Sequence, residues 1–200
     1  MLGCWEPRDA PLLKEAVDES IEELLPWMPW AADEPQPLEA KVQLLRGFRG
    51  SFDLGRDFVY GILSPDEAAA VGGTGLHPRV GDDAFEIGYW IRTSRVGRGF
   101  ATEASAALTR VAFELCGADR VEIRVDPANV ASAAVPRKLG YLEEARLRRR
   151  LRYPEPRDVL VFSLLAADFA GSPAADAPYE AYDAAGTRLP DRKRGRTAGR

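Results

Sequence analysis

The chain has 200 residues, a length that suits one domain with enough sequence to bury most of its apolar surface. Its formal net charge is −4, which argues against nucleic-acid binding through bulk charge. No apolar run reaches the roughly 20 residues that cross a bilayer, so we expect a cytoplasmic protein that does not contact a membrane.

The first part of the chain predicts two amphipathic helices, over residues 9–25 and 38–54. Two prolines, Pro26 and Pro29, end the first of them. Its apolar residues recur at helical spacing among acidic residues, and this stripe comprises Leu12, Leu13, Val17, Ile21, Leu24 and Leu25.

Two tryptophans, Trp27 and Trp30, lie in the proline-broken segment between these helices. Aromatic side chains in such a segment can form a rigid apolar wall for a ligand, although they can equally pack the first helix onto the core. The neighbouring acids Asp33 and Glu34 would favour a cationic ligand.

Three apolar segments then predict strands over residues 58–63, 71–76 and 85–91. Asp66 and Glu67 fall in the turn between the first two strands. His77, the only histidine, ends the second strand, and Glu86 begins the third.

The third strand runs into a glycine-bearing turn that opens directly into a helix predicted over residues 101–115. Gly97 and Gly99 lack a Cβ, so the backbone can turn sharply and bring its N–H groups against a ligand. The helix adds unpaired first-turn donors and the positive end of its dipole, which together indicate a site for a phosphorylated compound. On the turn alone two alternatives stay open: a dinucleotide-binding fingerprint with Thr102 at its third small position, and a loop that binds nothing.

The remaining segments predict a strand over 121–125, a short helix over 130–139 and two strands over 142–153 and 159–165. Cys116 is expected in the buried last turn of the helix over 101–115, which Gly117 caps. Cys4 and Cys116 lie far apart without metal-ligand spacing, so they indicate free thiols and no metal site. The elements together predict an α/β protein with a mixed, mostly antiparallel sheet.

The composition changes at Gly171, so we expect a domain over residues 1–170 and a polar tail over 171–200. Ala185-Gly186 offers the turn of a small hairpin in this tail. The run Arg192–Arg196 is better explained by a solvated tail than by a nucleic-acid contact. A second basic run, Arg146–Arg152, is expected to be mostly a solvent face, with one or two arginines able to reach a cofactor phosphate or an acidic acceptor.

Four motifs in a fixed order distinguish between the alternatives for the turn. They are Glu86-Ile-Gly-Tyr-Trp-Ile91, Gly97-Arg-Gly-Phe-Ala-Thr-Glu-Ala104, Arg120-Val-Glu-Ile-Arg-Val-Asp-Pro-Ala-Asn129-Val-Ala-Ser132 and Lys138-Leu-Gly-Tyr141. Over about residues 7–169 this series resembles the GNAT superfamily of acyl-CoA-dependent N-acyltransferases, in particular its ribosomal-protein N-terminal acetyltransferase (RimJ/RimL) branch. The resemblance implies a single domain with a mostly antiparallel twisted sheet flanked by helices, acetyl-CoA or another acyl-CoA as co-substrate, and no metal.

In that family the pattern Gln/Arg-x-x-Gly-x-Gly/Ala cradles the pyrophosphate of coenzyme A. The pattern falls on residues 96–101, with Gly99 and Ala101 at its small positions and Val96 in place of the usual Gln or Arg. The residues that the resemblance implies in cofactor binding are Ile91, Val96, Gly97, Arg98, Gly99, Phe100, Ala101, Thr102, Asn129, Ser132 and Lys138.

The implied reaction is the attack of an amine on a thioester carbonyl, which needs a proton acceptor for the amine and a proton donor for the leaving thiolate. Pro136 occupies the position of the tyrosine that often donates this proton in the family, so Ser132 is the candidate donor. Asn129 is the candidate for holding the pantetheine arm or a water, and it also suits a cap of the following helix.

Glu86 is the first candidate for the base, because it begins the strand that leads to the cofactor turn and an apolar surround would favour its taking up a proton. A strand-end carboxylate with a surface partner is the alternative. His77 is the second candidate base. The expected acceptor-binding residues are Trp27, Trp30, His77 and Trp90.

The acceptor itself stays open among a protein N-terminal amine, a lysine side chain, a polyamine and an amino sugar, with a homodimer as one expected assembly. Because Val96 and Pro136 depart from the family pattern, a catalytically silent CoA-binding module on the same fold is the alternative function.

Overall fold

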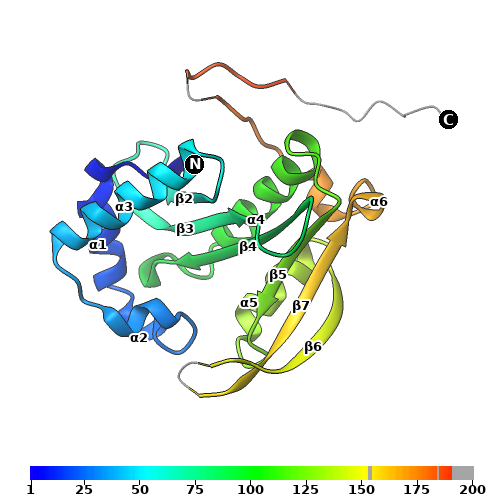
Figure 1. The fold of residues 1–200 in the computed structure, drawn as a ribbon, viewed down its shortest axis with the longest axis horizontal. Helices are drawn as coiled ribbons and strands as arrows, with labels where there is room; N and C mark the ends of the chain where they lie inside the picture. Colours follow the sequence, from blue (N-terminus) through cyan, green and yellow to red (C-terminus); the bar gives the residue numbers. More distant parts are fainter. Residues whose placement is uncertain (153–154, 184, 191–200) are drawn as a thin grey trace.

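The computed structural model describes residues 1–152, 155–183 and 185–190, and these residues form one seven-stranded sheet with helices against both faces (Figure 1). The order of the strands is β1-β2-β3-β4-β5-β7-β6, and all neighbours are antiparallel except β4 and β5. The strands are β1 (Leu2–Cys4), β2 (Phe58–Leu63), β3 (Ala70–His77), β4 (Ala84–Ile91), β5 (Arg120–Val125), β6 (Leu142–Leu151) and β7 (Arg157–Leu165). The predicted mixed, mostly antiparallel sheet is therefore confirmed.

The helices lie between the strands along the chain. The α-helices are α1 (Ala10–Asp18), α2 (Ile21–Leu24), α3 (Leu38–Asp53), α4 (Phe100–Arg110), α5 (Val130–Lys138) and α6 (Ala166–Phe169). Short helical turns are η1 (Pro7–Asp9), η2 (Pro29–Asp33), η3 (Thr93–Arg95) and η5 (Pro173–Asp176), and the π-helical turn η4 (Val111–Leu115) continues α4. The predicted helix over 38–54 and the strand over 58–63 agree with α3 and β2.

The prediction of a single helix over residues 9–25 is wrong. The structure has two helices there, α1 and α2, and the helical path is interrupted at Ser20. Ser20 is fully buried, and its hydroxyl donates to the Ala16 carbonyl and accepts from the Thr93 backbone N–H. A hydroxyl that bonds to nearby backbone competes with regular helix formation, and here it also ties the break to η3. The apolar stripe ends earlier than expected, since Leu25 is exposed.

Strand β1 was not predicted, because three residues are too few to show an alternating pattern. Leu2–Cys4 pairs antiparallel with β2, from Leu2 opposite Ile62 to Cys4 opposite Tyr60, and so completes one edge of the sheet.

The two largest clusters of the core lie on opposite faces of the sheet. On the face covered by α4 and α5, buried side chains such as Ile87, Val121 and Phe162 pack together. On the opposite face of β2 and β3, helices α1 and α3 pack around Trp5 and Leu45. The two clusters hold the helices of the N-terminal half and of the C-terminal half on opposite sides of the sheet.

The parallel strands β4 and β5 are paired along only part of their length. The registered pairs run from Ala84 opposite Arg120 to Glu86 opposite Glu122, and beyond them the two strands diverge (Figure 1). Among the residues that the structure describes, the last residues of β4, which include Tyr89 and Trp90, therefore have no strand neighbour on the β5 side. This divergence separates the two halves of the sheet at the residues that precede the glycine turn.

The first residues after the predicted domain boundary pack on α4. Ala174 is fully buried, the Arg110 guanidinium lies 4.5 Å from the centre of the Tyr179 ring, and the Tyr179 hydroxyl donates to Glu114. The segment that begins at Gly171 is therefore packed against the domain at Ala174 and Tyr179, and is not solvated there as expected. The boundary at residue 170 stays a prediction.

Further along, Tyr182 pairs with Arg188 as in the expected small hairpin, and the run 192–196 lies outside the described residues.

Cys116 is exposed rather than buried, although Gly117 adopts the left-handed conformation of a helix cap with φ +71°. Among the described residues, the helices are all too short or too polar to cross a bilayer.

Candidate functional site

A cavity of about 480 Å³ lies where the end of β4, the glycine turn and the start of α4 meet α5 and the segment after α2. The predicted site residues that line it are Trp27, Trp90, Ile91, Val96, Gly97, Arg98, Gly99, Phe100, Ala101, Thr102, Asn129, Ser132 and Lys138. Three predicted residues, Glu86, His77 and Trp30, are not part of its lining. Trp30 packs edge-on against Trp90, which lines the cavity, with 5.9 Å between the ring centres.

The glycine turn has the backbone geometry that an anion site needs. Gly97 has φ +74° and Gly99, which precedes the first residue of α4, has φ +86°. The first backbone bond of the helix runs from the Glu103 N–H to the Gly99 carbonyl, so the N–H groups of residues 100–102 have no partner within the helix. These N–H groups and the positive end of the helix dipole therefore lie at the cavity, which Arg98 also lines.

Helix α1 holds the turn in place from the other half of the sheet. Arg92, directly after β4, donates to Glu15 at 2.7 Å and to Glu19 at 2.6 Å. Glu19 also accepts from the Ser94 backbone N–H at 3.0 Å. The hydrogen bonds from Arg92 and Ser94 lower the pKa of Glu19 to about 2, so its carboxylate stays charged at neutral pH.

Helix α5 presents a hydroxyl to the same cavity. The Asn129 side chain accepts the Ser132 backbone N–H at 3.0 Å, so its expected role as a helix cap is confirmed. Ser132 in turn contacts a tyrosine of β4. The Tyr89 hydroxyl lies 3.1 Å from the Ser132 hydroxyl and donates to the Ser132 carbonyl at 3.0 Å.

Tyr89 is a site residue that the sequence analysis missed. It lies within the motif Glu86–Ile91, and strand alternation would place it on the opposite face from Glu86 and Trp90. That alternation was a usable signal, but the helix that the side chain meets depends on tertiary packing. Burial raises the pKa of Tyr89 to about 12, so the hydroxyl keeps its proton at neutral pH.

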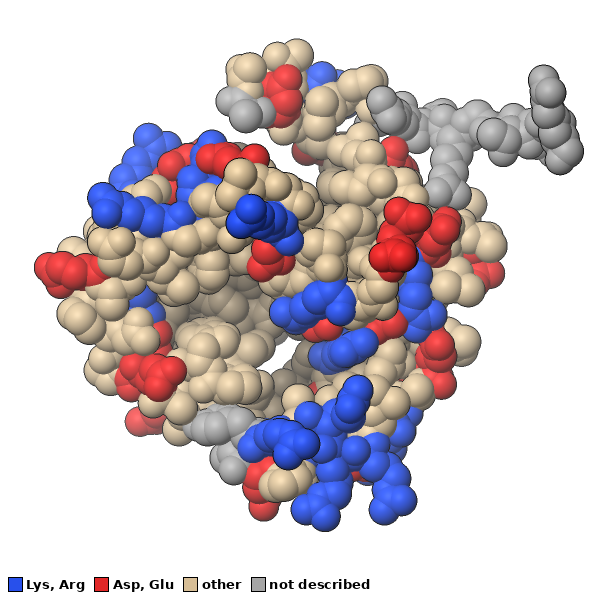
Figure 2. All heavy atoms as spheres, viewed as in Figure 1, with Lys and Arg blue, Asp and Glu red and all other residues tan. Residues whose placement is uncertain are grey.

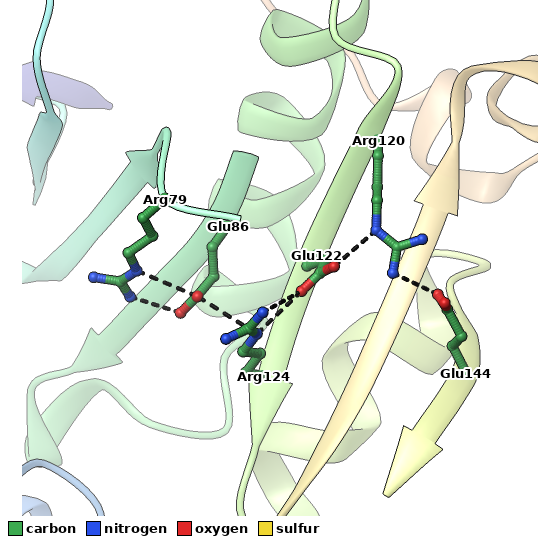
Figure 3. Close-up of polar contacts among 6 residues, drawn as sticks. All are labelled: Arg79, Glu86, Arg120, Glu122, Arg124 and Glu144. Atoms are coloured by element: carbon green, nitrogen blue, oxygen red, sulfur yellow. Dashed lines mark hydrogen bonds and ion pairs between the residues drawn. The ribbon is translucent and has the colours of Figure 1, made fainter. Parts of the chain in front are cut away.

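Glu86 does not have the apolar surround that was expected. Its carboxylate accepts from Arg79 at 2.6 and 3.2 Å and lies 3.7 Å from Arg124 (Figure 3). Arg124 also pairs with Glu122 at 3.0 Å, so this guanidinium bridges the last paired residues of β4 and β5. The ion pairs continue from Glu122 through Arg120 to Glu144 of β6.

His77 is also held away from the cavity. Its Nδ1 lies 2.6 Å from an Asp57 oxygen, and its ring covers Gly75, where an added Cβ would come within 2.3 Å of Nε2. The histidine therefore has a carboxylate partner 20 residues away in the sequence, which local motif analysis did not find. Its ring packs on the sheet beside Glu86, its neighbour across β3 and β4.

The two acids expected to favour a cationic acceptor, Asp33 and Glu34, do not line the cavity, and a different acid does. Glu34 is buried against Lys41 of α3, so its charge is neutralised inside the protein. Glu23 of α2 lines the cavity instead and accepts from the Thr93 hydroxyl at 3.1 Å.

Comparisons with known proteins agree with this arrangement. Residues 1–142 match the family described as Acetyltransferase (GNAT) domain. YdaF of Bacillus subtilis (strain 168), provisionally named a ribosomal N-acetyltransferase, is 30% identical over 169 residues, which cover 83% of this chain and 91% of YdaF. The structure of Mycobacterium smegmatis RimJ in complex with CoA-disulfide is 27% identical with a TM-score of 0.77, covering 87% of this chain and 85% of RimJ. The structure of RimL, a ribosomal L7/L12 alpha-N-protein acetyltransferase in complex with coenzyme A, shares the fold with a TM-score of 0.74 at 20% identity, covering 82% of this chain and 92% of RimL.

Proposed function

Because the chain belongs to the GNAT acetyltransferase family, we propose that it transfers the acetyl group of acetyl-CoA to an amine of a polypeptide. It is an N-acetyltransferase, and nothing in the comparisons favours a catalytically silent module on the same fold. One observation carries the assignment of the site: the anion-binding turn and the paired hydroxyls of Tyr89 and Ser132 line one cavity. A cytoplasmic homodimer remains a prediction.

The residues of the turn fit the diphosphate of coenzyme A. Gly97 and Gly99 hold left-handed backbone that exposes successive N–H groups at the start of α4. The Val96 side chain is 60% exposed and supplies none of the polar contacts that Gln or Arg gives in the family. Arg98 and Lys138, which line the same cavity, supply positive charge for the phosphates.

In the reaction, the amine nitrogen forms a bond to the thioester carbon and the carbon–sulfur bond breaks. The amine loses a proton, and the departing thiolate takes one up. Ser132 is the proposed donor of the second proton, because its hydroxyl lies in the cavity and α5 has Pro136 instead of a tyrosine. Holding both reactants in one cavity supplies a large part of the rate by orientation.

Glu86 remains the proposed base, with His77 as the alternative. Glu86 lies where β4 and β5 begin to diverge, and its side chain is 12% exposed between two guanidinium groups. If Glu86 accepts the proton, Glu86→Gln should lower kcat/KM by about 10²–10⁴-fold and remove the lower limb of the pH profile. If His77→Ala alone has that effect, the histidine is the base. If neither variant changes the rate, the amine arrives neutral and positioning suffices.

Three features support a polypeptide acceptor. RimL is named for the ribosomal protein L7/L12, and YdaF is named a ribosomal N-acetyltransferase. Trp27 and Trp90 give the cavity rigid apolar walls that suit the first side chains of a polypeptide. Glu23 places a negative charge where a cationic amine would enter.

The test combines binding and turnover. Acetyl-CoA should raise the melting temperature, and thiol release should then be measured with N-terminal peptides, a lysine peptide, a polyamine and an amino sugar. Release with peptides is the expected result. Release with only the small amines would overturn the polypeptide acceptor, and no stabilisation by any CoA ester would overturn the assignment of the cavity.

A further inference from the structure

Strand β6 concentrates positive charge on a protein whose net charge is negative. Five exposed arginines lie within seven residues of this strand and its end, and no acidic residue interrupts them. We call this set the basic edge, and it comprises Arg146, Arg148, Arg149, Arg150 and Arg152. Figure 2 shows lysine and arginine side chains gathered at the end of the molecule where β6 and β7 run together in Figure 1.

The nearby acids form an ion pair with only one arginine of the basic edge among the described residues, Arg146. Glu143 pairs with Arg137 and Glu144 with Arg120, so both are directed to other partners. Asp158 pairs with Arg146 at 2.8 Å and accepts the Arg149 backbone N–H. Within the described part of the chain, the guanidinium groups of Arg148, Arg149 and Arg150 therefore have no ion pair.

The basic edge belongs to ordered structure rather than to a loose tail. Leu147 pairs with Val159 and Leu151 with Arg157, and Arg148–Arg150 lie in an irregularity of the register between these two pairs, with Arg149 at φ +50°. In the sheet order β6 is terminal, so its other side has no strand neighbour among the described residues. Because a bulge interrupts regular strand pairing, the exposed arginine side chains are what this part of the edge offers to a partner.

A bridge joins the end of β6 to the wall of the cavity. Arg157, which pairs with Leu151, donates to the Pro26 carbonyl at 2.6 Å and lies 5.7 Å from the centre of the Trp27 ring. Trp27 lines the cavity. A chain whose amine enters beside Trp27 can therefore continue along β6.

We propose that the basic edge is the docking surface for an acidic segment of the polypeptide acceptor. This inference rests on the proposed function and adds the chemistry of the acceptor beyond its reacting amine. Arginine suits the role because its planar guanidinium binds carboxylates in a bidentate way. Opposite charge on partner and surface also raises the rate of encounter.

Two other occupants fit the surface less well. Residues 142–152 contain no aromatic side chain on which bases could stack, and the net charge of −4 opposes a nucleic acid elsewhere on the protein. A second copy that paired through the same edge would bring arginines against arginines, and like charges in register destabilise a strand pair.

The test compares Arg148→Glu/Arg150→Glu with a matched charge reversal, Arg46→Glu/Arg56→Glu. The control arginines are exposed, have no ion pair among the described residues and do not line the cavity. Three peptides with the same N-terminal residues and a neutral, acidic or basic extension serve as acceptors, with acetyl-CoA as donor. A labelled acidic peptide also reports binding by fluorescence anisotropy without turnover.

The wild-type protein should prefer the acidic extension over the neutral one by about tenfold or more in kcat/KM at low salt. The preference should shrink as salt is raised, because screening shortens the reach of exposed charges. The β6 double variant should lose it and keep the wild-type rate on the neutral peptide, while the control variant keeps both.

An unchanged preference in the β6 variant, or an equal loss in the control, would overturn the proposal. So would tight binding of a single-stranded RNA oligonucleotide that only the β6 variant abolishes, without any preference among peptides. If no peptide is acetylated, the proposed function fails, and anisotropy still decides the docking surface separately: binding of the acidic peptide that the β6 variant loses would support it.

Discussion

The contact between Tyr89 and Ser132 decides what the serine can do. A serine hydroxyl rotates freely unless a partner fixes it, and the Tyr89 hydroxyl is 3.1 Å from it while bonding to the carbonyl of the same residue. Because burial raises the pKa of Tyr89 to about 12, the tyrosine remains a neutral hydrogen-bonding group at working pH. We therefore expect Tyr89 to act through Ser132 as a positioning residue.

Tyr89→Phe should lower kcat about fivefold, because the variant loses one orienting hydrogen bond worth about 1 kcal/mol and keeps the ring. The acetyl-CoA dissociation constant should stay close to that of the wild type. Steady-state kinetics and calorimetric titration measure the two effects.

Tyr60→Phe is the matched control, since Tyr60 is a partly buried tyrosine of β2 that does not line the cavity. A loss of rate in both variants would show a general packing effect and remove the role of Tyr89. A wild-type kcat in Tyr89→Phe would also contradict the positioning role of Tyr89.

At the scale of elements, the end of β4, the turn and the start of α4 act as one unit. Arg92 and Ser94 attach this unit to Glu19, which directly follows α1. The turn itself depends on Gly99, at which an added Cβ would meet no atom within 4 Å. The cost of a substitution is therefore conformational, because φ is +86° and branched residues avoid that region.

Gly99→Val should weaken acetyl-CoA binding by at least about tenfold, because the valine backbone leaves the left-handed region and turns the N–H groups away from the phosphates. Gly99→Asn should bind more tightly than the valine variant, since asparagine tolerates positive φ.

Calorimetric titration and circular dichroism of both variants check this expectation. Equal affinity in the valine variant and the wild type would contradict the phosphate-binding assignment. We expect the valine variant to have an unaltered circular dichroism spectrum and about tenfold weaker binding of acetyl-CoA. If the valine variant does not fold, the affinity of the asparagine variant for acetyl-CoA tests the assignment instead.

At the scale of the molecule, the segment after α6 belongs to the packed structure. Ala174 is fully buried, and Tyr179 contacts both Arg110 and Glu114. Because Arg110 also donates to the Ala177 carbonyl, residues 171–179 are bound to α4 by backbone and side-chain contacts. Composition alone had suggested a solvated tail from Gly171.

Truncation after Ala170 should therefore lower the melting temperature by about 4–10 °C, since a chain of this size loses about 2–4 °C per kcal/mol. Truncation after Pro190 should leave the melting temperature nearly unchanged, because it keeps all of these contacts. Calorimetry of the two truncated proteins measures the difference. An equal melting temperature after both truncations would show that residues 171–190 contribute nothing to stability.

Local patterns were enough to predict most elements, and they placed the glycine turn at the start of a helix. Strand alternation and helical spacing report how each residue lies relative to its own element, and Gly97 and Gly99 report the local backbone. These signals need only neighbours in sequence, so β2, α3 and the turn were predicted with bounds close to those observed.

The tertiary structure decided the partners of the reactive groups. Tyr89 meets Ser132 across 43 residues, His77 meets Asp57 across 20, and Glu86 lies between two arginines at the point where β4 and β5 diverge. The same holds for Ala174, whose small side chain carries no sequence signal of burial. Such contacts depend on how separate elements pack, and a pattern within one element contains no information about which surface another element will bring against it.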